Sequence, residues 1–299
     1  TEIIYLCSVS ALSYFNFQVK KGLSMTKNVN NLSWQRVYIT GGASGIGMSL
    51  AKIMLANGAN LAIFDIRISD EAKAELEQAK NNPQQKVSFH TVDVTDSDAV
   101  VGEVLEASES IGKPDLALNV AGIQLAKTFE QLSAQEFERV VSINLFGSRN
   151  FASAVLPLMS SGGQLAFVAS LAGLISNYTY AAYSASKFGV VALAGVLRQE
   201  YAVNGIKVSV VCPGEITTPM VIEELKTMHP VTKELKSLAS NISLEQACKE
   251  IISQLQKGKF LIIPGFMARF TYWLNRLVPL CLFNKLIDNI IKKTLAKNS

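Results

Sequence analysis

The chain has 299 residues, of which 49% are hydrophobic, and a formal net charge of +4. This length allows one large domain or two small ones with a sizeable core. The lysines and arginines are scattered except near the C-terminus, which argues against a nucleic-acid-binding face. The four cysteines lie far apart and neither histidine has a partner at metal-ligand spacing. We therefore predict no disulfide framework and no metal site, and we expect a reducing, cytoplasmic setting.

Residues 1–33 are predicted to be an N-terminal extension outside the main domain. Residues 3–17 are fairly apolar and are followed by Lys20 and Lys21. A membrane anchor is one interpretation, but the run contains polar residues and is shorter than the about 20 apolar residues that a span needs. We favour a leader or an artefact of the reading frame, with Met25 as the alternative start.

From residue 36 onward, short apolar runs alternate with helical patterns. The predicted strands are residues 37–40, 60–65, 86–92, 115–119, 164–169, 206–212 and 260–263. The predicted helices are residues 45–57, 69–80, 95–111, 133–156, 181–203 and 243–256, and capping-box patterns begin at Ser133 and Ser243. This alternation predicts an α/β fold, a doubly wound parallel Rossmann sheet with helices on both faces, over residues 34–265.

A glycine-rich segment from Thr40 to Gly47 follows the first predicted strand and opens a helix. We expect Gly41 to permit the tight turn, Gly45 to let the backbone approach a pyrophosphate, and Gly47 to allow close helix–strand packing. A helix N-terminus also attracts phosphate. The segment therefore predicts a dinucleotide site. Its predicted contacts are Gly41, Ala43, Ser44, Gly45, Ile46 and Gly47.

The ends of the next two strands bear on the choice of cofactor. Asp65 ends the second strand, where a carboxylate would accept hydrogen bonds from an adenosine ribose and repel a 2′-phosphate. Arg67 is the opposing signal, because it could pair with that phosphate. The balance favours NAD(H), with NADP(H) as the alternative. Asp93 and Val94 follow the third strand, where the carboxylate either meets the adenine amine or is a simple turn residue.

Tyr183 and Lys187 are four residues apart in a predicted helix and so share one face. An ammonium beside a phenol favours the phenolate and lowers its pKa, which would let Tyr183 give or take a proton near neutral pH. Tyr178 and Tyr180 have no lysine four residues further on. Together with the dinucleotide site, the pair predicts hydride transfer coupled to proton transfer.

At this point the chain resembles the short-chain dehydrogenase/reductase family, from Trp34 to Ile263. The resemblance rests on the glycine segment, the run from Asn119 to Gly122, and the following single positions: Asn144, Ser170, Tyr183, Lys187, Pro213 and Gly214. Val120 departs from the second asparagine that the family usually has there.

The resemblance implies a role for each of these residues. Tyr183 would exchange a proton with the substrate oxygen, and Lys187 would lower its pKa and hold the nicotinamide ribose. Ser170 would polarise the substrate carbonyl, and Asn144 would hold a water that links Lys187 to solvent. The implied cofactor contacts are Asn119, Ala121, Gly122, Tyr183, Lys187, Pro213, Gly214 and Thr218. We also expect a homo-oligomer.

The segments expected to contact substrate are apolar. Residues 218–240 contain Met220, Val221, Ile222, Leu225 and Met228, and residues 171–175 are also apolar. Methionine-rich helices can form adaptable pockets, although simple lid packing explains the pattern equally well. No arginine stands out as a clamp for an acidic substrate. We therefore expect a hydrophobic, lipid-like alcohol or ketone.

Residues 266–299 are predicted to form an amphipathic helical tail. Aromatic and aliphatic residues recur at helical spacing among basic residues, and Pro279 should divide the segment into two helices. This pattern indicates either a peripheral membrane contact or packing against the core or a partner subunit. Charges interrupt every long apolar run, which argues against a membrane span.

The region from Thr218 through the tail is similar to the 3-ketodihydrosphingosine reductase branch of the family. The similarity rests on Thr218 to Met220, the Glu-rich helix that follows, and the Ser243 helix leading to Phe260. That branch generally prefers NADPH, from which Asp65 departs. The alternatives are a catalytically silent dinucleotide-binding sensor or scaffold, against which the intact Ser170, Tyr183 and Lys187 argue, and a membrane-associated structural protein.

Overall fold

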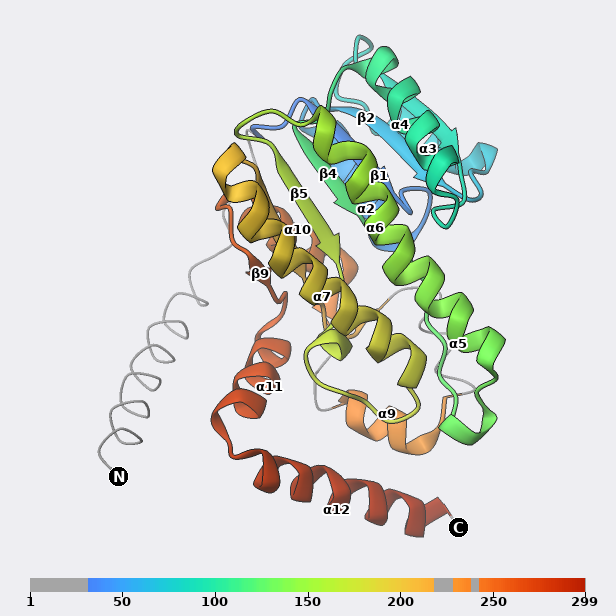
Figure 1. Ribbon diagram of the computed structural model, residues 1–299, viewed down its shortest axis with the longest axis vertical. Coiled ribbons are helices and arrows are strands. Elements are labelled where there is room, and N and C mark those ends of the chain that lie inside the picture. The colour runs from blue at the N-terminus through green and yellow to red at the C-terminus, as the bar shows by residue number, and fades with distance from the viewer. Residues whose placement is uncertain (1–31, 218–227, 238–241, 299) are drawn as a thin grey trace, which may run out of the picture.

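The computed structural model describes residues 32–217, 228–237 and 242–298. In these residues the predicted fold is confirmed, because one parallel sheet of seven strands carries helices on both faces (Figure 1). Some predictions lie outside the described residues, namely the apolar run at residues 3–17, Thr218, Met220, Val221, Ile222 and Leu225.

The seven strands follow the order β3-β2-β1-β4-β5-β6-β9, and each neighbouring pair is parallel. Each strand matches a predicted run to within one residue at either end. The strands are β1 (Arg36–Thr40), β2 (Asn60–Asp65), β3 (Val87–Thr91), β4 (Leu116–Asn119), β5 (Gln164–Val168), β6 (Lys207–Val211) and β9 (Leu261–Ile262). The winding reverses beside β1 and β4, and open α/β sheets bind ligands at such a switch point.

Two hydrophobic cores lie on opposite faces of the sheet. Because strand side chains alternate between faces, Tyr38 packs in one core while Val37 and Ile39 pack in the other. The helices on the Tyr38 face are α4 (Ser97–Ile111), α6 (Gly147–Val155) and α7 (Ala181–Tyr201). Those on the other face are α2 (Gly45–Ala56), α3 (Asp70–Gln78) and α10 (Leu244–Gln256).

The helix predicted over residues 133–156 is interrupted. Ser133 and Glu136 form the expected capping box at the start of α5 (Ala134–Val141). The next residues, Ser142–Phe146, form a π-helical turn before α6 continues. The predicted long helix is therefore confirmed, but the π turn within it was not predicted. A π turn inserts an extra residue into the helix, which changes the direction of the side chains after it, and such turns often occur at functional sites.

A second, two-stranded sheet joins β7 (Ile216–Thr217) to β8 (Ile242–Ser243). It ties the segment that leaves β6 to the start of α10. Between the two strands in the sequence lies α9 (Pro230–Ser237). The first strand of this sheet begins two residues after Gly214, so the pairing restrains the chain beside a predicted cofactor contact.

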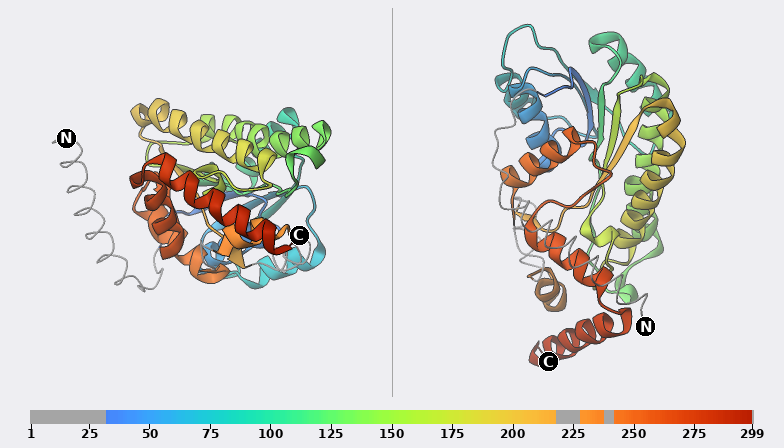
Figure 2. Two further views of the ribbon diagram at one scale, coloured as in Figure 1. Left: turned by 90° about the horizontal axis from the view of Figure 1, so that it is seen from below. Right: turned by 90° about the vertical axis from the view of Figure 1, so that its left-hand side faces the viewer.

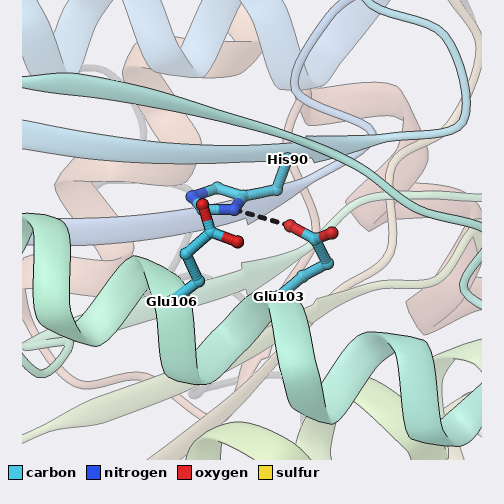
Figure 3. A group of neighbouring side chains, drawn as sticks. All are labelled: His90, Glu103 and Glu106. Atoms are coloured by element: carbon cyan, nitrogen blue, oxygen red, sulfur yellow. Dashed lines mark hydrogen bonds and ion pairs between the residues drawn. The ribbon is translucent and has the colours of Figure 1, made fainter.

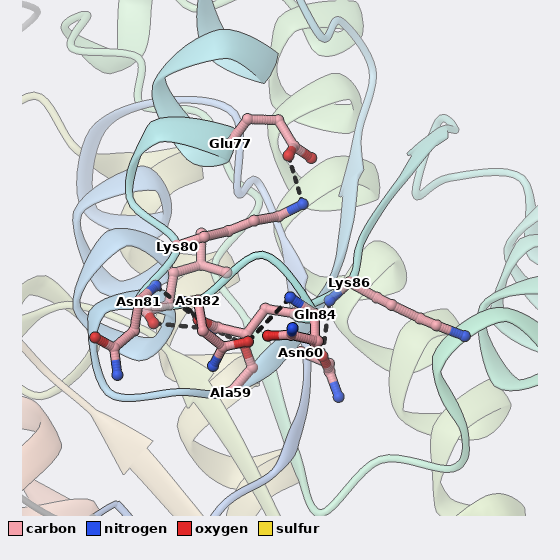
Figure 4. Close-up of polar contacts among 10 residues, drawn as sticks. Ala59, Asn60, Glu77, Lys80, Asn81, Asn82, Gln84 and Lys86 are labelled. Carbon is pink, nitrogen blue, oxygen red and sulfur yellow. Dashed lines mark hydrogen bonds and ion pairs between the residues drawn. The ribbon is translucent and has the colours of Figure 1, made fainter.

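The connection between α3 and β3 is held by side-chain hydrogen bonds at the amino ends of β2 and β3 (Figure 4). The buried Gln85 amide donates to the carbonyl oxygens of Leu55 and Ala59, at 2.9 and 2.7 Å, and its oxygen accepts from the backbone of Asn81 and Asn82. These bonds satisfy buried backbone groups far from the carboxyl ends of the strands. We therefore regard this cluster as structural.

The tail forms two helices, α11 (Phe266–Leu277) and α12 (Leu280–Asn298), separated at Pro279 as predicted. The β5 arrow points toward the end of the molecule where α9, α11 and α12 lie (Figure 1), and the view from below shows α12 crossing that end (Figure 2). Ala268 and Phe283 are buried, so the tail is anchored to the rest of the chain. Among the described residues, none of the helices combines the length and apolar character that a membrane span requires.

Candidate active site

A cavity of about 1000 Å³ opens at the carboxyl ends of the strands. The glycine segment, the predicted catalytic residues and the tail all contribute to its lining. It is thus large enough for a cofactor and a sizeable substrate, since ligand sites commonly measure about 300–1,000 Å³.

The glycine segment is shaped by close backbone contacts. A Cβ on Gly47 would lie 2.0 Å from the carbonyl oxygen of Gly41, and a Cβ on Gly41 would lie 2.8 Å from the backbone of Ala121. Gly41 and Gly45 also have positive φ angles, of 65° and 52°, which glycine adopts without strain. Among the described residues, no atom outside the helix's own backbone and the chain neighbours lies within 4 Å of a Cβ built on Gly45. The segment therefore packs tightly on the protein side and is open on the cavity side, as a phosphate cradle requires.

Asp65 is fixed beside this cradle. Its Oδ2 accepts a hydrogen bond from the backbone N–H of Ala43 at 3.1 Å, and its Oδ1 accepts from the N–H of Arg67 at 3.4 Å. Asp65 and Ile66 line the cavity, whereas Arg67 is exposed and is not part of the lining. Arg67 therefore lies two residues beyond Asp65, outside the cavity lining.

Thr40 and Asn119 hold the ends of β1 and β4 together. The buried Thr40 hydroxyl accepts from the Asn119 side chain at 3.1 Å and from the N–H groups of Val120 and Ala121 at 3.1 and 3.2 Å. Asn119 accepts in turn from the Ser148 hydroxyl at 2.6 Å. Asn119 is not in the cavity lining, so it positions the lining residues Ala121 and Gly122 rather than facing the cavity.

Asn144 lies in the π turn and is fully buried. Its amide bridges the backbone of Ile123, accepting from the N–H at 2.8 Å and donating to the carbonyl at 2.9 Å. It also donates to the Ser186 hydroxyl at 2.9 Å. A Cβ on Gly122 would lie 3.0 Å from Asn144 Oδ1 and 3.2 Å from Lys187 Nζ, so both polar groups border that glycine.

Lys187 is buried and lines the cavity. Its ammonium donates to the Val168 carbonyl oxygen at 3.0 Å and lies 5.8 Å from the centre of the Tyr183 ring. Burial lowers the pKa of Lys187 from 10.5 to about 8. The side chain therefore remains mainly charged at neutral pH. Tyr183 lies on the same helix face and lines the cavity, as predicted.

Ser170 precedes a short 3-10 turn, Leu171–Gly173, and caps it by accepting from the N–H of Ala172 at 3.1 Å. That bond uses a lone pair and leaves the hydroxyl hydrogen available to a ligand. A Cβ on Gly173 would lie 2.7 Å from the Lys187 carbonyl oxygen, so this turn packs tightly against α7. Ser170, Tyr183 and Lys187 thus line one part of the cavity.

The remaining predicted contacts divide into two groups. Asp93, Val94, Pro213 and Gly214 line the cavity, as do Ser44 and Ile46. Ala43 is not part of the lining but supplies the N–H that fixes Asp65. Each lining residue follows a strand of the sheet or begins α2, which explains why sequence motifs alone locate them.

Several polar residues of the cavity were not predicted as site residues, among them Gln124, Tyr180, Glu215 and Lys236. Gln124 donates to the Tyr180 hydroxyl at 2.7 Å, and the Tyr180 ring meets Tyr183 edge-on with 5.4 Å between centroids. Lys236 lies 5.6 Å from the centre of the Tyr180 ring and 3.4 Å from Glu215. All four residues line the cavity. The expectation of a wholly apolar substrate side is therefore incomplete.

The tail supplies an apolar wall of the same cavity. Met267, Phe270 and Leu274 of α11, and Phe283, Leu286 and Ile290 of α12, line the cavity. Leu171 and Ile175 extend the apolar lining on the side of Ser170. The predicted apolar segment after Ser170 is therefore part of the cavity.

One histidine–carboxylate cluster lies apart from the cavity lining (Figure 3). His90 of β3 meets Glu103 of α4 at 2.8 Å through Nδ1 and Ser88 at 2.9 Å through Nε2, with Glu106 close by. The ring also stacks on Phe64, with 4.8 Å between centroids. Because both ring nitrogens have protein partners, we regard the cluster as a structural link between the sheet and α4.

The chain matches a known protein family and is similar to several enzymes. Residues 35–229 match the family model described as short chain dehydrogenase. The chain is 34% identical over 230 residues to 3-ketodihydrosphingosine reductase of Bos taurus, covering 75% of this chain and 69% of that protein. It is 28% identical over 246 residues to D-beta-hydroxybutyrate dehydrogenase of Cupriavidus necator, covering 82% and 92%. Levodione reductase, a solved structure, matches with a TM-score of 0.69 at 27% identity, covering 79% of this chain and 98% of that one.

Proposed function

We propose that this chain acts on a long-chain ketone of the 3-ketosphinganine type. The chain belongs to the short-chain dehydrogenase family and is an oxidoreductase of CH–OH and C=O groups. The observation that carries this proposal is the shared cavity, which joins Ser170, Tyr183 and Lys187 to the apolar wall of α11 and α12. A long alkyl chain would bury apolar surface against that wall, at about 0.8 kcal/mol per CH₂ group.

A nicotinamide dinucleotide fits the cradle and, when bound, supplies the hydride. The protein holds it through the open backbone of the glycine segment, through Asp65, and through Pro213 and Gly214. We infer that NAD(H) is preferred, because Asp65 is fixed at the cavity and Arg67 is outside its lining. NADP(H) is the alternative that the proposed branch would favour.

Residues of the chain itself transfer the proton that the substrate oxygen receives. Tyr183 gives its hydroxyl proton to the substrate oxygen during reduction, and the nearby Lys187 ammonium stabilises the resulting phenolate. Ser170 donates a hydrogen bond to the same oxygen. Asn144 sets the backbone of Ile123 and borders Gly122 beside Lys187, which suits a role in supporting the lysine and a water linked to it.

We also infer that the tail contacts a membrane surface. The tail exposes Leu277, Leu280, Leu282 and Leu295. Residues 280–298 carry four lysines against one acidic residue, Asp288. Such a surface suits an anionic bilayer, where each basic residue contributes about 1 kcal/mol. The proposed units are then residues 34–265 as the catalytic domain and residues 266–299 as a tail that closes the cavity. A homo-oligomer packed through the tail is the competing arrangement.

A ketone panel with NADH and NADPH tests the proposed function. The full chain should reduce a long-chain 2-amino-3-ketone with a kcat/KM at least tenfold above that for a short ketone. Equal values for short and long ketones would contradict the role of the apolar wall. Absence of turnover on every ketone and alcohol, with intact dinucleotide binding, would favour the silent sensor or scaffold.

A further inference from the structure

We propose that Glu215 and Lys236 form a subsite for the amino-alcohol head group of the substrate. This inference rests on the proposed function and names the residues that select its substrate. Glu215 follows Gly214 in the loop after β6, and Lys236 lies on α9, 21 residues further along the chain. Their side chains are 7% and 12% exposed and line the cavity.

The pair lies close to the proposed reaction centre. Tyr183 touches Tyr180, whose ring lies 5.6 Å from the Lys236 ammonium, and Lys236 meets Glu215. One aromatic ring thus separates the Tyr183 side chain from the charged pair. A polar group on a carbon next to the ketone would fall in this region, while the alkyl chain would extend toward the tail.

The geometry of the pair leaves room for a third polar group. Lys236 Nζ and Glu215 Oε1 are 3.4 Å apart, whereas close charge-assisted hydrogen bonds measure about 2.7–2.9 Å. Glu215 Oε2 has no hydrogen-bond partner among the described residues. A buried ion pair is costly unless additional hydrogen bonds satisfy its remaining sites. A ligand group that donates to Glu215 Oε2 would supply such a bond.

The pair also selects the chemistry of that ligand. It places an acceptor, Glu215, beside a donor, Lys236. An ammonium on the carbon next to the ketone would donate to Glu215, and a hydroxyl on the following carbon would accept from Lys236. Neighbouring amine and hydroxyl groups therefore match the two protein groups as donor and acceptor. The ligand class is a long-chain 2-amino-1-hydroxy ketone and its 2-amino-1,3-diol product.

The test compares ligands of one chain length with and without the amine. Binding of the 2-amino-1,3-diol and of the amine-free 1,3-diol is measured by titration calorimetry with the dinucleotide present, and kcat/KM is measured for the two matching ketones. The full-length wild type should prefer the amine-bearing forms about 10- to 100-fold, the range expected when a buried charged partner is left unpaired. Glu215→Gln should abolish that preference, so that within this variant the amine-bearing and amine-free forms differ by less than about threefold.

Three further variants separate the outcomes. Glu245→Gln removes a 75% exposed carboxylate on α10 and should leave the preference unchanged. Glu215→Asp keeps the charge and should retain part of the preference. Lys236→Gln should weaken both 1-hydroxy ligands and keep the amine preference. Equal wild-type binding of amine and amine-free ligands would overturn the inference. So would tighter binding of a 3-keto carboxylate that Lys236→Gln abolishes, because the pair would then be an anion site.

The binding and turnover measurements distinguish failure of the subsite inference from failure of the proposed function. If the amine preference is absent but long-chain ketones are reduced, the subsite is wrong and the proposed function stands. If no ketone is reduced, the proposed function is wrong, and the calorimetric comparison still decides whether Glu215 recognises an amine.

Discussion

The Lys187 ammonium lies 5.8 Å from the centre of the Tyr183 ring, one turn further along the same face of α7. Lys187 is buried and its pKa is lowered to about 8, so the protein keeps a charged group in an unfavourable environment. Burying the charge lowers folding stability, and this loss is explained if the charge stabilises the Tyr183 phenolate during turnover.

We predict that Lys187→Met stabilises the dinucleotide-free protein at pH 7. The folded state binds the Lys187 proton less readily than the unfolded chain does. The resulting loss of folding stability is therefore fully present below pH 8 and disappears as pH rises through 10.5. The shift corresponds to roughly 3 kcal/mol, and the lost bond to Val168 offsets about 1 kcal/mol. Urea unfolding should show a gain of about 1–3 kcal/mol at pH 7 that shrinks above pH 10.

The matched control is Lys249→Met, which removes an exposed lysine of α10. It should leave stability within about 0.5 kcal/mol at both pH values. A Lys187→Met protein that is less stable than wild type by the same amount at pH 7 and pH 10 would contradict the buried-charge account.

We predict that Gly47→Ala weakens dinucleotide binding at least tenfold. The new Cβ would lie 2.0 Å from the Gly41 carbonyl oxygen, so the cradle must shift. Gly102→Ala in α4 is the control, because no atom lies within 4 Å of its Cβ. That control should stabilise the fold by about 0.5–1 kcal/mol. Fluorescence titration measures binding, and unaltered affinity in Gly47→Ala would refute the role of this contact.

We predict that NAD(H) binds more tightly than NADP(H), and that Asp65→Ala narrows or reverses the difference. The carboxylate lies at the cavity and would repel a 2′-phosphate. Arg67→Ala should change NADPH affinity less than threefold, because Arg67 is outside the cavity lining. Tighter wild-type binding of NADPH, lost in Arg67→Ala, would show that the arginine decides the preference.

Two adjacent residues of α12 should have separable effects. Leu282 is exposed and Phe283 is buried in the cavity lining. Leu282→Glu should reduce sedimentation with anionic vesicles, whereas Phe283→Ala should raise KM for long-chain more than for short-chain ketones. Val203→Glu, at an exposed apolar site outside the tail, is the vesicle control. Unchanged vesicle binding by Leu282→Glu, together with loss of an oligomer, would identify the tail as a subunit contact.

The fold and the family were predictable because their signals are local. The family resemblance is confirmed over residues 35–229, and the strands match because buried runs are short and bounded by turn residues. The π turn around Asn144 was not predicted, because a shift of one residue is too small to recognise in an irregular apolar pattern. The Glu215–Lys236 pair was missed because it forms only when α9 folds back over the cavity.

The roles assigned to Tyr183 and its neighbours remain predictions. Tyr180 is an example of a cavity residue whose position could not be predicted from the sequence. It lacks a lysine four residues on, which excludes it as the proton donor, yet it lies against Tyr183 and bonds to Gln124. Its position follows from the β-bridge between Lys127 and Tyr180, a contact between distant segments.

The most direct measurement follows the ketone-dependent oxidation of the reduced dinucleotide by wild type and Tyr183→Phe, using the long-chain 2-amino-3-ketone. Wild type should turn over the ketone. Tyr183→Phe should lose about 10²–10⁴-fold in kcat and keep its dinucleotide Kd, because only the proton carrier is removed. A Tyr183→Phe protein that retains most of the wild-type kcat would contradict the assignment of Tyr183 as the acid in this cavity.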